Sequence, residues 1–489
     1  MVQKNSFLKS SVVMVVGRVA ILAFGLLFSP LLVRVLSKEE YGIFAAVIAI
    51  FSIMELVSNA GLFDSVRKHM ASSSDGRDQT DIVYASYLLG LVYGVLSLVL
   101  IVAVAVSFLS GQRSELLIIL GVAMIGNNIY RISRSAFHGR QQEQYAIFFN
   151  VLQNAVYFVA GLGLGLFFGV FGVIVGNVLS FYAAAIVGTV YVNRHFEKVS
   201  LQFDRVKHRF RPLATYGATQ MVGGVAVVIL YKVDILLINY FLGATETASY
   251  QAAIIPAEFV WFIPSAVQTV VLQNVATHWS NDDVKQIDRN LTAAVKWSAL
   301  FLILVCVGLF GLAEPFITLY YGENYLDSVA PLQILLLGTF FFGVARIFIP
   351  ALQATGWIRY TESLHVIVLV LNVALNVVMI PMYGITGAAV ATSASYSLVL
   401  FGGLVIWHRS AMSFRSRSFP LRAGATAALF VAGYVPLVSW IQLPPLPKLL
   451  VCPPLGLVLF LLAATITGAL TREDYRLVWS KVRGAIDSR

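Results

Sequence analysis

Three basic side chains recur at helical spacing in the first half of the chain. Arg131, Arg134 and His138 stand at positions i, i+3 and i+7, which places them in one stripe along a helix. An offset of 215 residues aligns Arg131 with Arg346. A guanidinium binds phosphate oxygens through paired donors, so two such arginines predict a site for an anionic group. The alternative is that they are interfacial anchors at the ends of membrane spans.

Five ionisable side chains lie inside apolar stretches. Arg18 and Glu55 each fall about seven residues from one end of their stretch, a depth of about 10 Å, which predicts an ion pair. Lys232 and Glu258 both fall near mid-depth. Asp234 follows Lys232 by two residues and therefore lies on nearly the opposite helix face. Because ionisable groups cost about 2.5–3.5 kcal/mol in hydrocarbon, these side chains are expected to face protein or water. The alternative to a functional role for Arg18 and Glu55 is a purely structural ion pair.

The stretches that must position these residues are long and apolar. Hydrophobic residues make up 58% of the 489 positions, charged residues 12%, and the mean hydropathy is +0.82. A soluble domain is nearer one quarter charged. Because a bilayer core about 30 Å thick needs roughly 20 apolar residues per helix, the pattern predicts an all-α polytopic membrane protein with about fourteen spans. The predicted spans are 11–33, 41–62, 82–109, 115–137, 146–168, 171–192, 213–241, 247–274, 292–313, 326–350, 362–380, 384–407, 421–440 and 449–470.

Polar residues in the predicted span 362–380 have ordinary structural explanations. Asn372 and Asn376 are spaced i, i+4 and predict hydrogen bonds between helices. His365 fits a buried core histidine better than a proton relay.

The basic residues indicate an orientation. With the N-terminus inside, 28 of the 34 lysines and arginines fall on the cytoplasmic side, which also places the C-terminus there. Four fall outside, and Arg18 and Lys232 lie within spans. The bias explains the basic pI of about 9.5 without nucleic acid as a partner. The first span lacks a small-residue cleavage site and is expected to be retained.

An internal repeat relates the two halves. An offset of 206 aligns Glu40 with Glu246, and six spans per repeat give both repeats one orientation. We therefore expect two parallel six-helix repeats around a central substrate site, followed by two extra helices. The pairs at an offset of 215 are Arg131 with Arg346, Ala136 with Ala351, Tyr145 with Tyr360, Gly169 with Gly384 and Gly172 with Gly387. The expected parts are an N-terminal lobe at 1–212, a C-terminal lobe at 213–412, and two helices with a tail at 413–489.

Enzymatic signals are weak in this chain. HExxH, GxSxG and GxxxxGK[ST] do not occur, and the two cysteines have no zinc spacing. We expect no enzyme activity, no metal and no cofactor, and a transporter powered by a gradient or by the membrane potential. Another class is a membrane glycosyltransferase or polymerase, for which Glu314, Glu323 and Asp327 form the nearest acidic set.

Several segments resemble one known family. "FSPLLVRVLSKEEYGIFAAVIAIF" is similar to the first two helices of the polysaccharide transporter family, which includes O-antigen-type flippases of the multidrug/oligosaccharidyl-lipid/polysaccharide exporter superfamily. "YKVDILLINYFLGATETASYQAA" resembles its seventh-to-eighth helix junction, with Asp234 at the acidic position. "ALQATGWIRYTE", "GITGAAVATSAS" and "LTREDYRLVWSKV" look like later segments in the same order.

The resemblance implies a flippase that moves polyprenyl-phosphate- or diphosphate-linked glycans outward by ion- or potential-driven alternating access. Such a protein would serve surface polysaccharide or glycoprotein synthesis. It implies a monomer in the plasma membrane, with the lipid-linked glycan, membrane lipids and glycosyltransferases or a polymerase of the pathway as partners. The implied basic lining is Arg18, Arg131, Arg134, Arg346 and Lys232, and the implied ion-coupling acids are Glu55, Asp234 and Glu258.

Charged residues in the spans distinguish lipid II flippases and drug exporters from other members of the superfamily. The lipid II flippase branch carries an arginine cluster in helices one, two and eight, of which this chain has Arg18 alone. The alternative function is an ion-coupled exporter of cationic drugs, for which Asp234 or Glu258 would supply the acidic cavity group.

Overall fold

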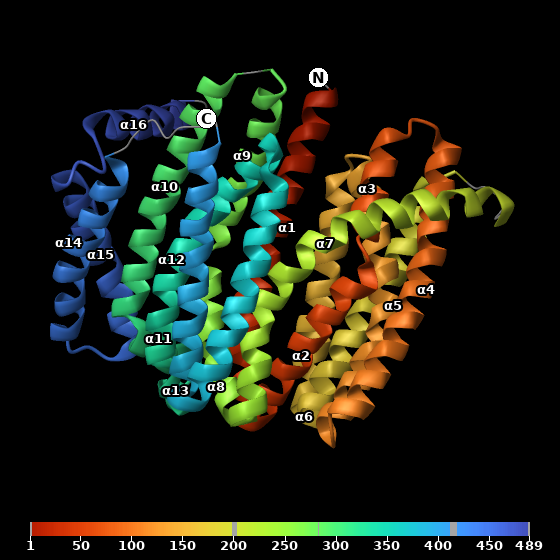
Figure 1. The fold of residues 1–489 in the computed structure, drawn as a ribbon, viewed down its shortest axis with the longest axis horizontal. Helices are drawn as coiled ribbons and strands as arrows, with labels where there is room; N and C mark the ends of the chain where they lie inside the picture. Colours follow the sequence, from red (N-terminus) through yellow and green to blue (C-terminus); the bar gives the residue numbers. More distant parts are fainter. Residues whose placement is uncertain (1, 198–202, 282, 411–417, 488–489) are drawn as a thin grey trace. The chain divides into compact units, whose positions relative to one another are not determined.

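The computed structural model describes residues 2–197, 203–281, 283–410 and 418–487. This part of the chain is built from helices and contains no strand (Figure 1). It forms two compact units, Met1–Ala248 and Ser249–Arg489, which are described one at a time.

In the first unit, α5 is the central helix. It packs against both α4 and α6, while α1 packs on α6 and α2 packs on α7. Short breaks of a few residues separate successive helices, which leaves no room for a folded loop domain between them. The helices are α1 (Val2–Val35), α2 (Lys38–Asn59), α3 (Leu62–Ser72), α4 (Gly76–Phe108), α5 (Gln112–Gly139), α6 (Glu143–His195), α7 (Phe203–Leu242) and the start of α8 (Ala244–Phe259).

In the second unit, α12 takes the corresponding central place and packs against α9, α10 and α13. A 3-10 turn, η1, precedes α12, and a π-helical turn, η2, follows it. The elements after α8 are α9 (Phe262–Trp279), α10 (Val284–Gly311), α11 (Ala313–Tyr320), η1 (Glu323–Ser328), α12 (Val329–Leu352), η2 (Gln353–Trp357), α13 (Ile358–Arg409), α14 (Phe419–Trp440), α15 (Pro445–Ile466) and α16 (Arg472–Asp487).

Two unusually long helices, α6 and α13, are helical hairpins. A straight helix of 53 or 52 residues would be about 80 Å long, far more than a bilayer core of about 30 Å. Each turns back at a glycine: Gly169 has φ 57° and ψ −141°, and Gly384 has φ 61° and ψ −146°. These are the two glycines that the offset of 215 aligns. Within α13 the amide of Asn372 donates to the Ser395 hydroxyl at 3.1 Å, which ties the two arms together and confirms the predicted bond for Asn372. The amide of Asn376 instead donates to the Asn372 carbonyl of its own arm at 3.0 Å.

The second glycine of each hairpin has an equally matched environment. A Cβ atom on Gly172 would overlap the carbonyl oxygen of Leu164, and one on Gly387 would overlap that of Met379. In both cases the oxygen belongs to the residue eight positions earlier. The shared geometry is the structural counterpart of the repeat detected in the sequence.

The all-α polytopic class is confirmed. Within the described residues, ten helices are long and apolar enough to cross a membrane, or eleven if α8 and α9, bent by 46° at their junction, are taken as one span. The count of fourteen stays a prediction, because this total counts the α6 hairpin once and takes the whole of Glu323–Arg409, which includes α12 and the α13 hairpin, as one span. Of the predicted lobe boundaries, 212 falls inside α7 and 412 lies outside the described residues, so the division into lobes also stays a prediction.

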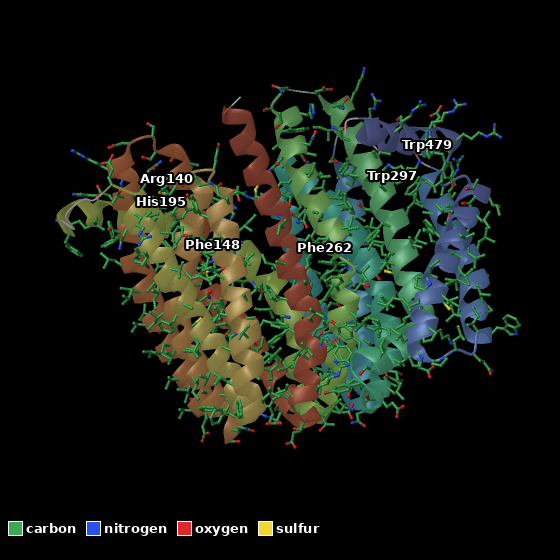
Figure 2. The ribbon with its side chains drawn as sticks, turned by 180° about the vertical axis from the view of Figure 1, so that it is seen from behind. Arg140, Phe148, His195, Phe262, Trp297 and Trp479 are labelled. Atoms are coloured by element: carbon green, nitrogen blue, oxygen red, sulfur yellow. The ribbon has the colours of Figure 1, made fainter. Side chains whose placement is uncertain are left out.

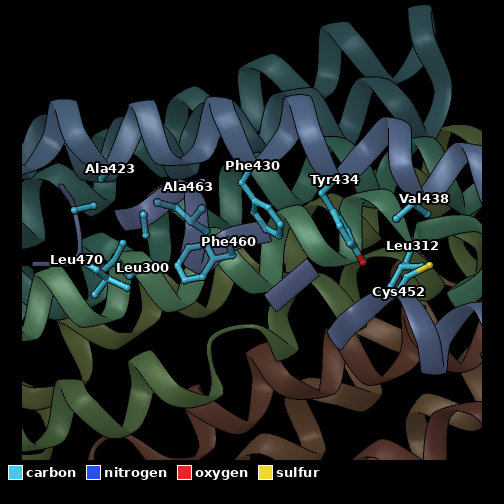
Figure 3. Packing of buried hydrophobic residues seen from close by; sticks show 13 residues of the cluster. Leu300, Leu312, Ala423, Phe430, Tyr434, Val438, Cys452, Phe460, Ala463 and Leu470 are labelled. Carbon is cyan, nitrogen blue, oxygen red and sulfur yellow. The ribbon is translucent and has the colours of Figure 1, made fainter. Parts of the chain in front are cut away.

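The two extra helices, α14 and α15, pack on α10 through an apolar core (Figure 3). Phe430 and Tyr434 of α14 stack at 5.1 Å between ring centroids, and Phe460 of α15 meets Phe430 edge-on at 5.6 Å. Leu300 of α10 and Cys452 of α15 complete this core. The buried rings fix α14 and α15 to the second unit.

Predicted cytoplasmic loops in the first unit are joined by basic side chains. The Arg140 guanidinium donates to the His195 carbonyl at 2.9 Å and to the Gln79 side chain at 2.7 Å (Figure 2). It also lies 3.6 Å from the Phe196 ring centroid. One arginine therefore connects the ends of α4, α5 and α6.

Candidate functional site

The arginine stripe lies along one face of α5. Arg131 pairs with the carboxylate of Glu55 on α2. Asn127, one turn earlier on α5, donates its amide to the same Glu55 oxygen at 3.0 Å. Arg134 donates to His138 at 3.4 Å one turn later. The four α5 residues are spaced i, i+4, i+7 and i+11, so a single helical face carries them.

A sharp bend between α2 and α3 completes this N-terminal cluster. Ala60 and Gly61 have φ values of 46° and 69°, so α2 ends and α3 starts in a new direction. Phe63 follows the bend, and its ring centroid lies 5.4 Å from the Arg131 guanidinium carbon. This is within the range of a cation–π contact. A Cβ atom on Gly61 would overlap the carbonyl of Gly217, so α7 supports the bend and requires glycine there.

The contacts of the Arg131 guanidinium do not use all of its hydrogen-bond donors. Its Nη2 atom contacts Glu55, whereas Nε is buried and has no hydrogen-bond acceptor among the described residues. The side chain is 37% exposed and that of Glu55 is 18% exposed. If the side chain moves so that Nε is uncovered, a phosphate oxygen could accept from Nε while its companion oxygen replaces Glu55 at the neighbouring nitrogen.

The second unit holds a similar arrangement around Arg346. Its guanidinium carbon lies 5.4 Å from the Trp261 ring centroid and 5.9 Å from that of Phe342. Trp261 stands at the bend between α8 and α9, where its indole nitrogen donates to the Thr339 carbonyl at 2.8 Å. Each repeat-related arginine thus lies beside an aromatic ring at a break in a neighbouring helix.

The predicted partner of Glu55 is wrong. Glu55 pairs with Arg131, while Arg18 is an exposed side chain on α1. The physical reason is packing: α2 lies against α5 over a longer contact than against α1. Depth alone could not show which of two neighbours would supply the arginine.

The remaining predicted residues lie on α7 of the first unit and on the part of α8 in the second unit. On α7, Asp234 is fully buried and accepts from the Ile235 amide at 2.8 Å, whereas Lys232 is half-buried on another face, as their spacing predicts. Glu258 is half-buried on the part of α8 that belongs to the second unit. The common depth of Lys232 and Glu258 stays a prediction.

Sequence reasoning missed Asn127, Phe63 and Trp261. Asn127 precedes Arg131 by one turn, so its spacing was a usable signal. Phe63 had none. Pro256 and Pro264 flank Trp261 and indicate a hinge in that helix, but nothing in the sequence indicates the contact of Trp261 with Arg346. In the described residues no cluster of three His, Cys, Asp or Glu side chains is placed to hold a metal ion.

Known proteins share sequence similarity with this chain. Residues 31–330 match the model of a family described as polysaccharide biosynthesis protein. The chain belongs to this family. Among its relatives is a Shigella flexneri protein named as an O-antigen transporter, 30% identical over 204 residues, which cover 40% of this chain and 46% of that protein. A Haloferax volcanii protein named as a low-salt glycan biosynthesis flippase is 21% identical over 75% of this chain and 76% of its own.

Two solved transporter structures share the fold of this chain. The inward closed lipid II flippase MurJ superposes with a TM-score of 0.73 at 17% identity, covering 94% of this chain and 98% of that one. An inward-facing multidrug resistance MATE transporter of the MOP superfamily gives 0.64 at 14% identity, over 79% and 93%. At these identities the likeness establishes the fold.

Proposed function

We propose that the protein is a flippase that carries a phosphate- or diphosphate-linked glycan lipid across the membrane. The observation that carries the proposal is the pair of repeat-related arginines, Arg131 and Arg346, each half-buried beside an aromatic ring. Membership of the polysaccharide biosynthesis family and the flippase relatives support the substrate class. The fold shared with a lipid II flippase supports the transport plan.

In this proposal Glu55 competes with the substrate for Arg131. The carboxylate occupies one guanidinium nitrogen in the structure described here, so a phosphate must displace it. A cation bound at Glu55 would neutralise the competing charge and leave the guanidinium to the phosphate. Glu55 would therefore couple an ion gradient to binding, and the conformational cycle would be alternating access.

The other charged candidates take supporting roles. Arg134, Lys232 and Arg18 would extend the basic lining toward the glycan and its phosphate. Asp234 and Glu258 would be further coupling acids. We also propose a plasma-membrane location with cytoplasmic termini and a monomeric state, with enzymes of the same glycan pathway as partners.

The test is a double substitution, Arg131→Ala with Arg346→Ala, in cells that depend on this protein for surface glycan. Lipid-linked glycan should accumulate on the inner leaflet and surface glycan should fall at least tenfold, because the transported phosphate loses both paired donors. The matched control is Arg113→Ala with Arg359→Ala, which removes one arginine from α5 and one from α13 outside the clusters. Normal surface glycan in the first double variant would reject the proposal.

An exporter of cationic drugs is the second candidate, because the MATE transporters share the fold. Its acidic cavity group would be Asp234 or Glu258. Complete burial of the Asp234 side chain disfavours direct contact with a drug in the conformation described here. Increased dye sensitivity of a deletion strain with intact surface glycan would favour this candidate over the flippase.

A further inference from the structure

Helix α16 presents exposed aromatic side chains at its surface. Tyr475 and Trp479 are one turn apart, and they are 41% and 71% exposed. Figure 2 shows Trp479 on α16. The helix is strongly amphipathic and combines charged residues with apolar ones such as Leu477 and Val482. Tryptophan and tyrosine at such positions are typical of the membrane–water interface.

Three arginines border the aromatic pair. At 100° per residue, Arg472, Arg476 and Arg483 project within about 60° of Trp479 around the helix axis. All three side chains are exposed. Aromatic rings flanked by basic groups match a surface that has apolar chains below and phosphate groups above.

Helix α16 is also held by membrane-spanning helices of its own unit. Lys296 of α10 donates to Asp474 at 2.6 Å, and Asp474 lies about 140° around the axis from Trp479. The Tyr475 hydroxyl bonds to the Thr465 hydroxyl of α15 at 2.7 Å, one residue before α15 ends. α16 therefore lies at the end of a span and crosses the direction of α14 and α15 (Figure 1).

We propose that α16 lies on the bilayer surface and that its aromatic–arginine face binds anionic lipid headgroups. The phosphates of anionic lipids supply the complementary charge for the three arginines, and the interfacial region accommodates the Tyr475 and Trp479 rings. The contact is independent of the transported substrate and needs only that α10 and α15 cross the membrane.

The test uses the full chain reconstituted in vesicles, with an environment-sensitive fluorophore on a cysteine introduced as Trp479→Cys. The matched control is Glu473→Cys, an exposed position about 120° away on the same helix. In vesicles with phosphatidylglycerol, nitroxide-labelled lipid should quench the 479 label several-fold more than the 473 label. Aqueous iodide should show the reverse order. Equal iodide quenching at both positions would overturn the proposal, because the face would then be in water.

A second measurement tests the headgroup charge. Spin-labelled phosphatidylglycerol should be enriched near Trp479 relative to spin-labelled phosphatidylcholine. In the triple variant Arg472→Gln, Arg476→Gln and Arg483→Gln, the preference for phosphatidylglycerol should fall by about fivefold for each arginine that is removed. An unchanged preference in the triple variant would contradict the assignment of anionic lipid to this face.

Discussion

Arg131 is fixed by several contacts and still has one N–H donor without an acceptor among the described residues. Glu55 of α2 forms an ion pair with Arg131, and Asn127 of α5 donates to the same Glu55 oxygen. Phe63 of α3 lies beside the guanidinium. Its buried Nε atom has no hydrogen-bond acceptor among the described residues. A group arranged in this way can exchange one anionic partner for another without first losing a complete set of bonds.

The first prediction concerns the strength of the Glu55–Arg131 pair. Glu55→Gln should destabilise the purified protein by about 1.5–3 kcal/mol, because a part-buried guanidinium loses a charged partner. Adding Arg131→Gln should recover part of that loss, since the unpaired charge is removed as well. Chemical unfolding in detergent of both single variants and the double variant measures the coupling, and strictly additive effects would show that the pair contributes nothing.

The same substitution separates stability from transport. If Glu55 competes with the phosphate, Glu55→Gln should raise the affinity of Arg131 for phosphate and remove the effect of an imposed ion gradient on the flipping rate. Flipping of a fluorescent lipid-linked glycan into proteoliposomes measures both quantities. A gradient dependence equal to that of the parent protein would exclude Glu55 as the coupling acid.

At the scale of the element, the glycines of α6 and α13 determine the hairpins. Gly169 and Gly384 take backbone angles that other residues rarely adopt, and Gly172 and Gly387 allow the returning arm to approach a backbone carbonyl. Sequence alignment of the two halves paired these glycines correctly. The sharp bend at Ala60–Gly61 had no comparable signal. Pro256 and Pro264 flank Trp261 and indicate a hinge there, but a hinge does not show which side chain will contact an arginine.

The second prediction tests the close approach in both hairpins. Gly172→Ala and Gly387→Ala should each destabilise the protein by about 1–3 kcal/mol, because the added methyl group meets a backbone oxygen that has little freedom to move. Gly163→Ala is the matched control in α6, since its Cβ atom would meet no atom within 4 Å. Thermal unfolding compares the three. A control variant as unstable as the other two would refute the role of the carbonyl contact.

The third prediction concerns the attachment of α16. Burial by itself would raise the pKa of Asp474, but hydrogen bonds from Lys296 and Thr471 and the Lys296 charge outweigh it and lower that pKa. The stabilisation is therefore complete above the ordinary aspartate pKa of about 3.9 and is lost as the pH falls through and below that value. Asp474→Asn should increase hydrogen exchange in α16 about tenfold at neutral pH. Exchange equal to that of the parent protein would show that the contact does not hold the helix.

Across the whole molecule, the fold class and the repeat were predictable because both depend on patterns that extend over hundreds of residues. Apolar stretches predicted the helices, and paired glycines predicted the matched hairpins. Particular contacts were not predictable to the same degree. The assignment of Glu55 to Arg18 failed because depth limits the possible partners, while packing between α2 and α5 selects among them.

The fourth prediction addresses the orientation of the chain in the membrane. The ratio of 28 to 4 basic residues predicts that the loop with Ser74 faces the cytoplasm and the segment with Gln442 faces outward. Both positions are exposed breaks between helices, so cysteines there should react readily. In intact cells an impermeant maleimide should label Gln442→Cys, and Ser74→Cys only after permeabilisation.

The parent protein is a suitable control for this labelling because Cys306 and Cys452 are buried. Labelling of Ser74→Cys in intact cells, with Gln442→Cys protected, would invert the orientation. The face with Arg131 near the cytoplasmic end of α5 would then open outward, and a flippase that collects its substrate at the inner leaflet could not use that arginine first. Under the proposed flippase function, the orientation therefore decides whether the N-terminal cluster would receive the substrate or release it.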